Sequence, residues 1–451
     1  MRAWFKHSFA NILTFALALT ALVPCVRGEL WSTAYYAGWM QGQVPASRVD
    51  FTALSHIIHF SVLPNPNGSL DSSTHSLFPA NSADLLTRAH AAGRKVLISV
   101  GGADTQAAFQ SATTPTTAPF FISNLVQFAR ARGYDGIDID WEPLDASDAP
   151  QFTNFVRSLR SALNSIQPRP LLTAATASQP ALFASLKDQL DQINLMTYDL
   201  SGPWSGWITW FNAPIYSGNT RFPSTGGLVP SADGMVNDFI AAGVPPAKLG
   251  VGIAFYGVVW SAGTGTTTGG AAQPRQAWTT PPTTTAIPFD TIMSSYFQPQ
   301  RYRWDAAAQA AYLTIEEAGS ANDKFISYDD VRACQSKVSY ARNRGLGGVM
   351  IWELGTGYRS TQPEGQRDPL LQAIKQALAP TRLNPLTVTN DQISLSFTGM
   401  PLAQYRVQWT SNALATNWSS LPGTLSSTGG IIQLNDPIAP LPRFYRVKTP
   451  P

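Results

Sequence analysis

The chain has 451 residues, 44% of them hydrophobic, which is enough for one large globular domain and a smaller one. Its 31 basic and 28 acidic residues nearly cancel, and no Lys/Arg block is present, which argues against nucleic acid or an anionic membrane surface as a partner. A neutral substrate is expected.

The first predicted element is a secretory signal peptide over residues 1–28. A basic start precedes an apolar run from about Ile12 to Val23, and small residues follow up to Gly28. An N-terminal membrane anchor is the alternative, but the apolar run is shorter than the ~20 residues of a spanning helix. We therefore expect secretion, extracellular or periplasmic, and no membrane association after cleavage.

Eight apolar or β-branched segments come next, with amphipathic helical segments between several of them. The predicted strands are TAYYAG, LSHIIHFSVL, KVLISVGG, GYDGIDIDW, LLTAAT, QINLMTYD, KLGVGIAFYG and GGVMIWEL. Alternating strands and helices predict parallel pairing, and eight such units match a closed (β/α)8 TIM barrel of the α/β class. An open doubly wound sheet is disfavoured, because no Gly-rich dinucleotide turn follows the first strand.

Two segments depart from this alternation. A long stretch separates AFYG from FISYDD, so residues 258–324 are expected to form a small α+β insertion after the seventh strand. From residue 384 to 451, short strand patterns alternate with turn residues, which predicts a β-sandwich-like module of unknown role. The barrel domain is therefore bounded at residues 29–380.

The fourth predicted strand contains DGIDIDWE, with four carboxylates in eight positions. Asp138, Asp140 and Glu142 alternate with apolar residues, so they share one face and point into the barrel mouth. Glu142 lies at the C-terminal strand end, where such barrels carry their chemistry. Repulsion among these acids favours a protonated form, as a general acid requires. A hard-cation site is the alternative, but a straight strand face does not wrap oxygens around one point. For Asp135 a structural ion pair is expected.

This stretch resembles the signature D-G-x-D-x-D-x-E of glycoside hydrolase family 18, the chitinases and their relatives, from Asp135 to Glu142. AYYAGW, SVGG, MTYD, FYG and GVMIWELG match further family motifs in order, over about residues 30–380. The resemblance implies a secreted chitinase that hydrolyses β-1,4-N-acetylglucosamine linkages with retention, through an oxazolinium ion formed by the substrate's own acetamide. The implied partner is chitin or another N-acetylglucosamine polysaccharide. We expect no cofactor, no metal and a monomer.

The family pattern also implies roles for individual side chains. Glu142 is the general acid and base, Asp140 orients the acetamide and stabilises the oxazolinium ion, and Asp138 shares a proton with Asp140. Tyr198 donates to the acetamide oxygen. The implied substrate-binding residues are Tyr35, Ser99, Trp141, Met196, Asp199, Trp204, Tyr256 and Trp352.

Within that set, Trp352 is the implied apolar floor beneath the sugar, and Trp204 matches a platform on the leaving-group side. Tyr35 and Ser99 are implied to hydrogen-bond Asp138, or are ordinary polar groups of the barrel interior. The insertion is implied to wall one side of the cleft and to favour processive or exo-type action.

Other functions stay open. With the same chemistry, the alternative activities are those of an endo-β-N-acetylglucosaminidase acting on N-glycans and of a peptidoglycan glucosaminidase. The alternative that is not an enzyme is a chitin-binding, lectin-like protein. The presence of Glu142 disfavours this alternative. In the C-terminal module, Trp409 and Trp418 form either a flat platform for crystalline chitin or part of a core between two sheets.

Overall fold

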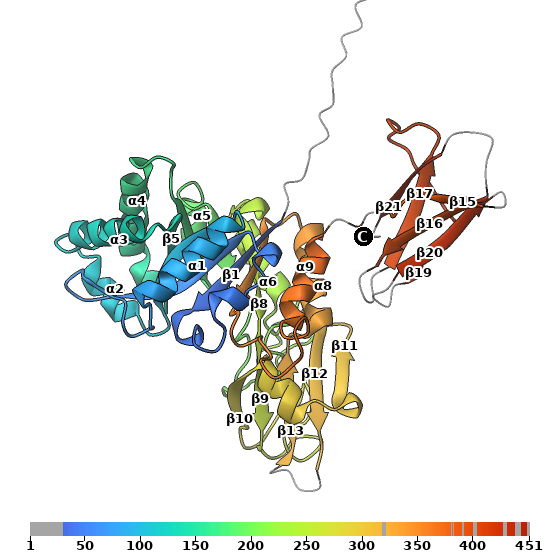
Figure 1. The fold of residues 1–451 in the computed structure, drawn as a ribbon. Coiled ribbons are helices and arrows are strands. Elements are labelled where there is room, and N and C mark those ends of the chain that lie inside the picture. Colours follow the sequence, from blue (N-terminus) through green and yellow to red (C-terminus); the bar gives the residue numbers. More distant parts are fainter. Residues whose placement is uncertain are drawn as a thin grey trace, which may run out of the picture.

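The computed structural model describes residues 30–317, 322–379, 381, 383–389, 392–399, 404–426, 431–437 and 443–448. The expected signal peptide lies outside these residues. The described chain forms a barrel, a sheet inserted into it, and a C-terminal group of strands (Figure 1). Within these ranges, no helix combines the length and the apolarity that crossing a bilayer requires.

A closed parallel barrel makes up most of the fold. Its strands are β1 (Trp31–Ala37), β2 (His56–Pro64), β4 (Lys95–Gly102), β5 (Gly136–Trp141), β6 (Leu171–Thr176), β7 (Gln192–Leu195), β8 (Leu249–Ala254) and β14 (Gly348–Trp352). β1 pairs in parallel with both β14 and β2, which closes the ring. The short β3 (Leu70–Asp71) pairs antiparallel with the end of β2. The predicted (β/α)8 barrel is confirmed, with a strand in each of the eight predicted segments.

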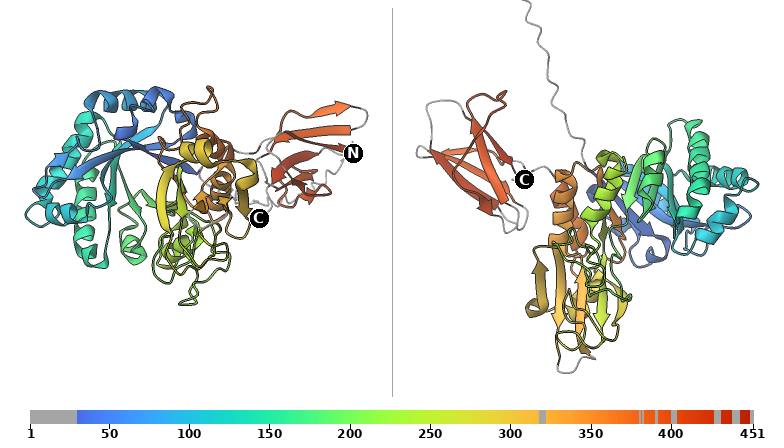
Figure 2. Two further views of the ribbon diagram at one scale, coloured as in Figure 1. Left: turned by 90° about the horizontal axis from the view of Figure 1, so that it is seen from below. Right: turned by 180° about the vertical axis from the view of Figure 1, so that it is seen from behind.

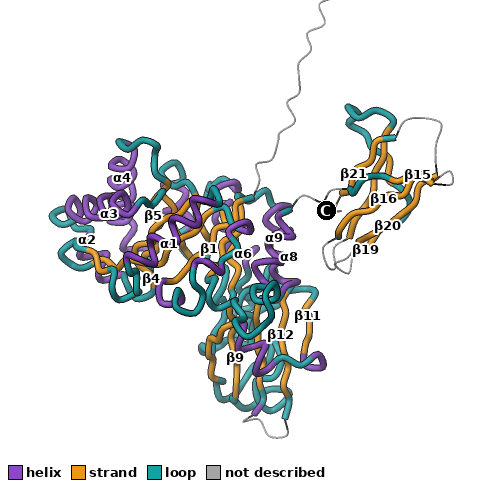
Figure 3. Tube along the Cα trace, in the orientation of Figure 1, coloured by secondary structure: helices purple, strands orange, loops and turns teal. Residues whose placement is uncertain are grey.

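Helices cover the outside of the barrel, as Figures 2 and 3 show. They are α1 (Pro79–Ala91), α2 (Gln106–Ala112), α3 (Ala118–Arg132), α4 (Ala149–Asn164), α5 (Pro180–Leu186), α6 (Ala232–Ala241), α8 (Val331–Asn343) and α9 (Pro369–Leu378). Short 3-10 turns are η1 (Gly38–Met40), η2 (Ala46–Arg48), η3 (Phe51–Ala53), η4 (Ala146–Asp148) and η5 (Pro246–Lys248). α3 ends at Gly133, whose φ of 83° suits glycine and turns the chain into β5. This cap begins the strand that carries the acidic motif.

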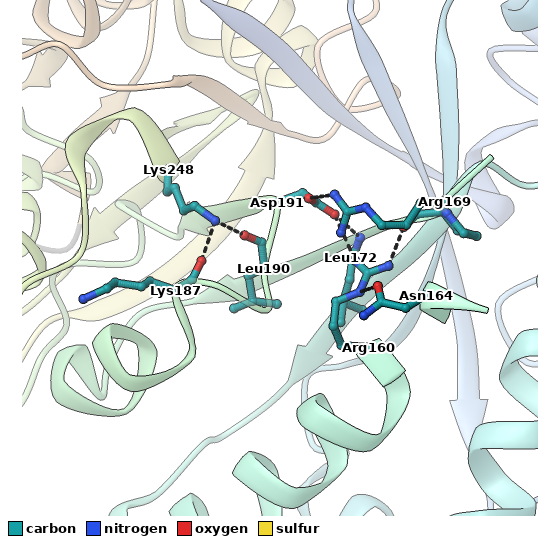
Figure 4. A network of polar contacts seen from close by, with 9 residues as sticks. Arg160, Asn164, Arg169, Leu172, Lys187, Leu190, Asp191 and Lys248 are labelled. Atoms are coloured by element: carbon teal, nitrogen blue, oxygen red, sulfur yellow. Dashed lines mark hydrogen bonds and ion pairs between the residues drawn. The ribbon is translucent and has the colours of Figure 1, made fainter. Parts of the chain in front are cut away.

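A polar network ties β6 and β7 together at their N-terminal ends, away from the barrel mouth (Figure 4). Asp191 accepts hydrogen bonds from the Leu172 N–H, from Arg160 at 3.1 Å and from Arg169 at 2.6 Å. Arg160 is almost fully buried and also donates to the carbonyl of Pro170. The guanidinium of Arg160 and the carboxylate of Asp191 therefore bond to each other and to backbone groups, so these charges have partners.

The insertion is a five-stranded sheet in the order β10-β9-β13-β12-β11. Its elements are β9 (Tyr256–Ser261), β10 (Thr283–Pro288), α7 (Phe289–Thr291), the π-helical turn η6 (Ile292–Tyr296), η7 (Pro299–Arg301), β11 (Tyr302–Asp305), β12 (Ala310–Ile315) and β13 (Lys324–Tyr328). It thus begins and ends a few residues outside 258–324. The long segment between β7 and α6 packs on it, with Trp210 and Phe211 buried beside Trp260 and Phe325.

The C-terminal strands form two sheets around a small core of their own. They are β15 (Thr387–Thr389), β16 (Gln392–Thr398), β17 (Gln404–Thr410), β18 (Ser419–Ser420), β19 (Leu425–Ser426), β20 (Ile431–Pro437) and β21 (Phe444–Lys448). Phe397 in β16 packs edge-on against Tyr405 in β17, at 5.1 Å between ring centroids.

Both tryptophans of this module lie beneath arginines. Trp409 is partly buried against the core, with the Arg443 guanidinium 4.2 Å from its ring centroid. The Arg446 guanidinium lies 4.3 Å from the ring centroid of Trp418. These contacts match packing within the module better than a flat, open platform.

Candidate active site

Strand β5 delivers the acidic motif to the mouth of the barrel. Asp138 and Asp140 are buried on its inner face, while Ile137 and Ile139 belong to the core between strands and helices. Glu142 follows directly after β5, and with Asp140 it lines a cavity of about 460 Å³. The alternation of a β-strand has therefore separated the acids from the apolar residues as the sequence predicts.

Asp138 lies below the cavity and is fully hydrogen-bonded. Its Oδ2 accepts from Tyr35 at 2.9 Å and from Ser99 at 3.1 Å, and its Oδ1 accepts from Thr173 at 2.5 Å. Burial raises the pKa of Asp138, and the three donors counteract that rise. In the described part of the chain, no group of three or more His, Cys, Asp or Glu side chains is arranged to hold a metal ion.

Asp140 and Glu142 form a hydrogen-bonded carboxyl pair. Burial, followed by the charges of Glu142 and Asp138, raises the pKa of Asp140 well above its usual range, and Asp140 donates to Glu142. Burial also raises the pKa of Glu142. The hydrogen bond with Asp140 lowers this pKa, and the charges of Asp199 and Asp104 raise it further. Oδ1 of Asp140 is buried and has no partner among the described residues. Burial therefore favours a shared proton on this pair and leaves one oxygen of Asp140 without a partner.

Tyr198 and Asp199 face this pair across the cavity. The Tyr198 hydroxyl has a weak acceptor, Met350 Sδ at 3.7 Å, so its hydrogen is available to a stronger one. Oδ1 of Asp199 accepts from Tyr256 at 2.7 Å. The backbone of Asp199 has a left-handed φ of 55°, and its N–H donates to Oδ1 of the buried Asn212 at 3.1 Å. Asn212 and Tyr256 thus hold Asp199 from both sides.

An aromatic wall completes the cavity, together with the half-buried Met196. Trp352, at the end of β14, meets Tyr35 edge-on at 5.3 Å and Phe60 at 4.8 Å between ring centroids. Trp39 and His75 continue the wall from Phe60. A wall of flat apolar rings beside buried carboxyl groups suits the C–H faces of a sugar.

Four of the eight expected substrate-binding residues do not line this cavity. Ser99 and Tyr256 lie behind it, bonded to Asp138 and Asp199, whereas Trp141 and Trp204 lie elsewhere. Trp141 stacks on Phe109 at 4.6 Å and is 2% exposed, so it faces the helices, and the expectation that it contacts substrate is not met. It occupies an outward-pointing position of β5. Trp204 lies in the segment after β7, is 52% exposed and meets Trp207 edge-on at 4.5 Å, outside the cavity around Glu142.

A second cavity of about 880 Å³ adjoins the first. Ala177, Leu200 and Met235 line both, so the two form one groove that runs from the loops after β1 and β2 toward α6. The residues that line the first cavity come from the barrel, and the insertion adds Ala307 to the second. The insertion, which is implied to wall one side of the cleft, therefore contributes Ala307 to the groove at a distance from Glu142.

Several residues of the site are missing from the set predicted from the sequence. They are Trp39, Phe60, His75, Thr173 and Asn212. Thr173 is recoverable from strand register, because it stands directly beside Asp138 in the β5–β6 ladder, as Ser99 does in the β4–β5 ladder. Phe60 belongs to β2, whereas Trp39, His75 and Asn212 come from segments between strands and helices, whose positions no periodicity predicts.

The chain matches the family model for glycosyl hydrolases family 18 over residues 32–357. It is 29% identical over 368 residues to a class V chitinase of Arabidopsis thaliana, across 76% of this chain and 89% of that protein. It is 30% identical over 321 residues to chitinase A1 of Niallia circulans, across 64% of this chain and 43% of that protein.

Solved structures give the same result. A class V chitinase variant from Nicotiana tobaccum in complex with NAG4 has a TM-score of 0.61 at 25% identity, covering 78% of this chain and 99% of that one. A group IV chitinase from Ostrinia furnacalis shares the fold, with a TM-score of 0.65 at 21% identity over 77% of this chain and 98% of that one. This chain therefore belongs to glycosyl hydrolases family 18 and is a glycoside hydrolase.

Proposed function

We propose that this enzyme is a chitinase that hydrolyses β-1,4 linkages between N-acetylglucosamine units, with Glu142 as general acid and base and the substrate's acetamide oxygen as nucleophile. The Asp140–Glu142 pair carries the proposal, since Asp140 is buried, Glu142 is half-buried, and the two are hydrogen-bonded at the C-terminal end of a barrel strand. The relatives named above as chitinases support the same substrate.

In the first step, Glu142 donates a proton to the glycosidic oxygen while the acetamide oxygen attacks the anomeric carbon, so the leaving sugar departs and an oxazolinium ion remains. In the second step, Glu142 takes a proton from a water molecule. The oxygen of that water attacks the anomeric carbon and opens the oxazolinium ring, which restores the acetamide. Burial raises the pKa of Glu142, which favours the protonated form that the first step requires.

The surrounding groups match an acetamide. The free, buried Oδ1 of Asp140 suits the acetamide N–H, and the weakly engaged hydroxyl of Tyr198 suits the acetamide oxygen. Trp352 supplies an apolar floor. The acetamide is thereby held against the anomeric carbon instead of rotating freely.

The groove supports a polymeric substrate. Its two cavities, of about 460 and 880 Å³, extend on both sides of the carboxyl pair and give room for several sugar units. We further propose that the protein acts outside the cytoplasm, because residues 1–28 have the layout of a signal peptide.

Hydrolysis of chitohexaose, followed by proton NMR from the first seconds, tests the mechanism. We expect the β-anomer to form first, no cleavage of fully deacetylated oligomers, and competitive inhibition by a thiazoline mimic of the oxazolinium ion. First formation of the α-anomer, or cleavage of the deacetylated oligomers at a similar rate, contradicts substrate assistance.

The substrate is tested with the same enzyme on three polymers. We expect the largest kcat/KM on chitin oligomers, compared with N-glycan cores and peptidoglycan fragments. A higher value on either of the latter overturns the chitinase assignment and leaves the chemistry intact.

A further inference from the structure

One imidazole on the cavity wall has no role in the mechanism above. His75 lies in the segment between β3 and α1, is half-buried, and lines the cavity that contains Glu142. In the ring order of the barrel, β1 and β2 stand opposite β6 and β7. His75 thus lies on the side of the groove away from the segment that carries Trp204.

The backbone around His75 is held firmly. The Asp71 carboxylate accepts from the Ser73 N–H at 2.7 Å and from the Thr74 hydroxyl at 2.5 Å, which closes a tight turn just before it. A Cβ on Gly38 would lie 2.1 Å from the carbonyl oxygen of His75, so this segment is seated directly on the chain that leaves β1. The ring is therefore presented by a rigid support.

The ring itself is fixed in plane by aromatic neighbours. It stacks on Phe60 with 5.6 Å between centroids and 17° between planes, and Trp39 meets it edge-on at 5.0 Å. Phe60 in turn meets Trp352, the proposed floor of the sugar site. His75 is thus an extension of the wall on which a sugar chain would lie.

A hydrogen-bond chain determines which ring nitrogen carries the hydrogen. Ser61 Oγ lies 2.7 Å from the carbonyl oxygen of Gly101 and 2.8 Å from His75 Nδ1. A carbonyl oxygen can only accept, so the single hydroxyl hydrogen of Ser61 goes to Gly101, and His75 Nδ1–H donates to Ser61 Oγ.

The second nitrogen follows from the first. Burial lowers the pKa of His75, against the opposing effect of Asp71, so the ring is neutral near pH 7. With its hydrogen on Nδ1, a neutral ring has an acceptor lone pair on Nε2, which points away from Ser61. Among the described residues, Nε2 has no hydrogen-bond partner.

We propose that His75 is a specificity-determining residue: its Nε2 accepts a hydrogen bond from a hydroxyl or amide N–H of a sugar unit bound on the β1–β2 side of Glu142. The assignment rests on the proposed function. A rigid acceptor increases the affinity for a sugar that has a donor at this position. A sugar without that donor binds more weakly, because the lone pair of Nε2 then loses its water without gaining a partner.

Two substitutions separate the nitrogens. His75→Asn places an amide N–H near the position of Nδ1, which keeps the bond to Ser61 and removes the outer acceptor. His75→Gln reaches the position of Nε2 and restores an acceptor. His90→Gln is the matched control, because His90 is exposed and pairs with Asp135 instead of lining the groove.

Each substitution is made in a Glu142→Gln background, and the binding of chitohexaose is measured by calorimetry, with melting temperature as a check on folding. We expect His75→Asn to raise Kd about tenfold, His75→Gln to recover a clear part of that loss, and His90→Gln to leave Kd unchanged. Equal Kd values for His75→Asn and its parent, or equal losses in the Asn and Gln variants, overturn the assignment.

Failure of the proposed function is recognised separately. If the wild-type enzyme neither cleaves nor binds chitin oligomers, the proposed function fails and the assignment of His75 fails with it. If the wild type cleaves them while the His75 variants bind like their parent, only the assignment of His75 is overturned.

Discussion

Tyr35, in β1, donates its hydroxyl hydrogen across the barrel interior to Oδ2 of Asp138, in β5, at 2.9 Å. The contact stabilises the charged form of Asp138, and that charge in turn helps to keep Asp140 protonated. Tyr35 thereby influences the carboxyl pair through Asp138.

Tyr35→Phe is therefore expected to lower kcat by about tenfold to a hundredfold, which corresponds to the ~1.5–3 kcal/mol of a hydrogen bond to a charged group. Tyr36→Phe is the control, because Tyr36 is equally buried but bonds to the carbonyl of Val44, away from the acids. Steady-state kinetics on a soluble chitooligosaccharide measure both. Equal losses in the two variants would show that Tyr35 acts only through stability.

Glu142→Gln retains the shape of the side chain and removes the proton donor. Turnover should fall by at least about a hundredfold while oligomer binding survives. Glu316→Gln, on the exposed surface of the insertion, serves as the control. Activity of the Glu142 variant near the wild-type level removes Glu142 from the proposed role.

Asp199→Asn should move the alkaline limb of the kcat/KM–pH profile to lower pH. The charge of Asp199 raises the pKa of Glu142, so removing it lowers that pKa, and the general acid loses its proton earlier as pH rises. Asparagine still accepts from Tyr256. Asp104→Asn should produce a smaller shift in the same direction, because Asp104 is exposed and screened by solvent. An alkaline limb that stays in place or moves to higher pH contradicts the proposed effect of the Asp199 charge on Glu142.

The network at the base of β6 and β7 predicts a contrast between two arginines that share Asp191. Arg160→Met should lower the free energy of unfolding by about 3 kcal/mol, because it leaves the carboxylate of Asp191 and the carbonyl of Pro170 without this buried donor. Arg169→Met should cost less than about 1 kcal/mol, because Arg169 is 46% exposed. Urea denaturation measures both, and kcat should be unchanged in each. A reversed order of the two losses contradicts the assignment of Arg160 as the main contact.

Truncation near Pro380 should leave hydrolysis of soluble chitooligosaccharides intact, because every residue of the proposed site precedes it and the C-terminal sheets have their own core. Adsorption to insoluble chitin is measured in parallel. Loss of activity on short oligomers, in a truncated protein that still melts cooperatively, shows that the module contributes to the groove. Equal adsorption of the full and truncated chains excludes a chitin-binding role for the module.

Strand positions and the acidic face of β5 could be predicted because they depend on neighbours in sequence. A period of two places Asp138, Asp140 and Glu142 on one face wherever the strand lies, and a barrel built from βα units has its reactive groups at the C-terminal strand ends. The same rule points Trp141 outward, which is why its assignment to the substrate site failed.

The remainder of the site depends on which distant segments meet. His75 reaches the cavity because its loop is seated on Gly38, and its free nitrogen follows from a contact with Ser61 in another strand. Asn212 holds Asp199 only because the chain after β7 folds back over the barrel mouth. Such contacts join residues through packing of loops, for which the sequence has no period, so they are visible only in the folded molecule.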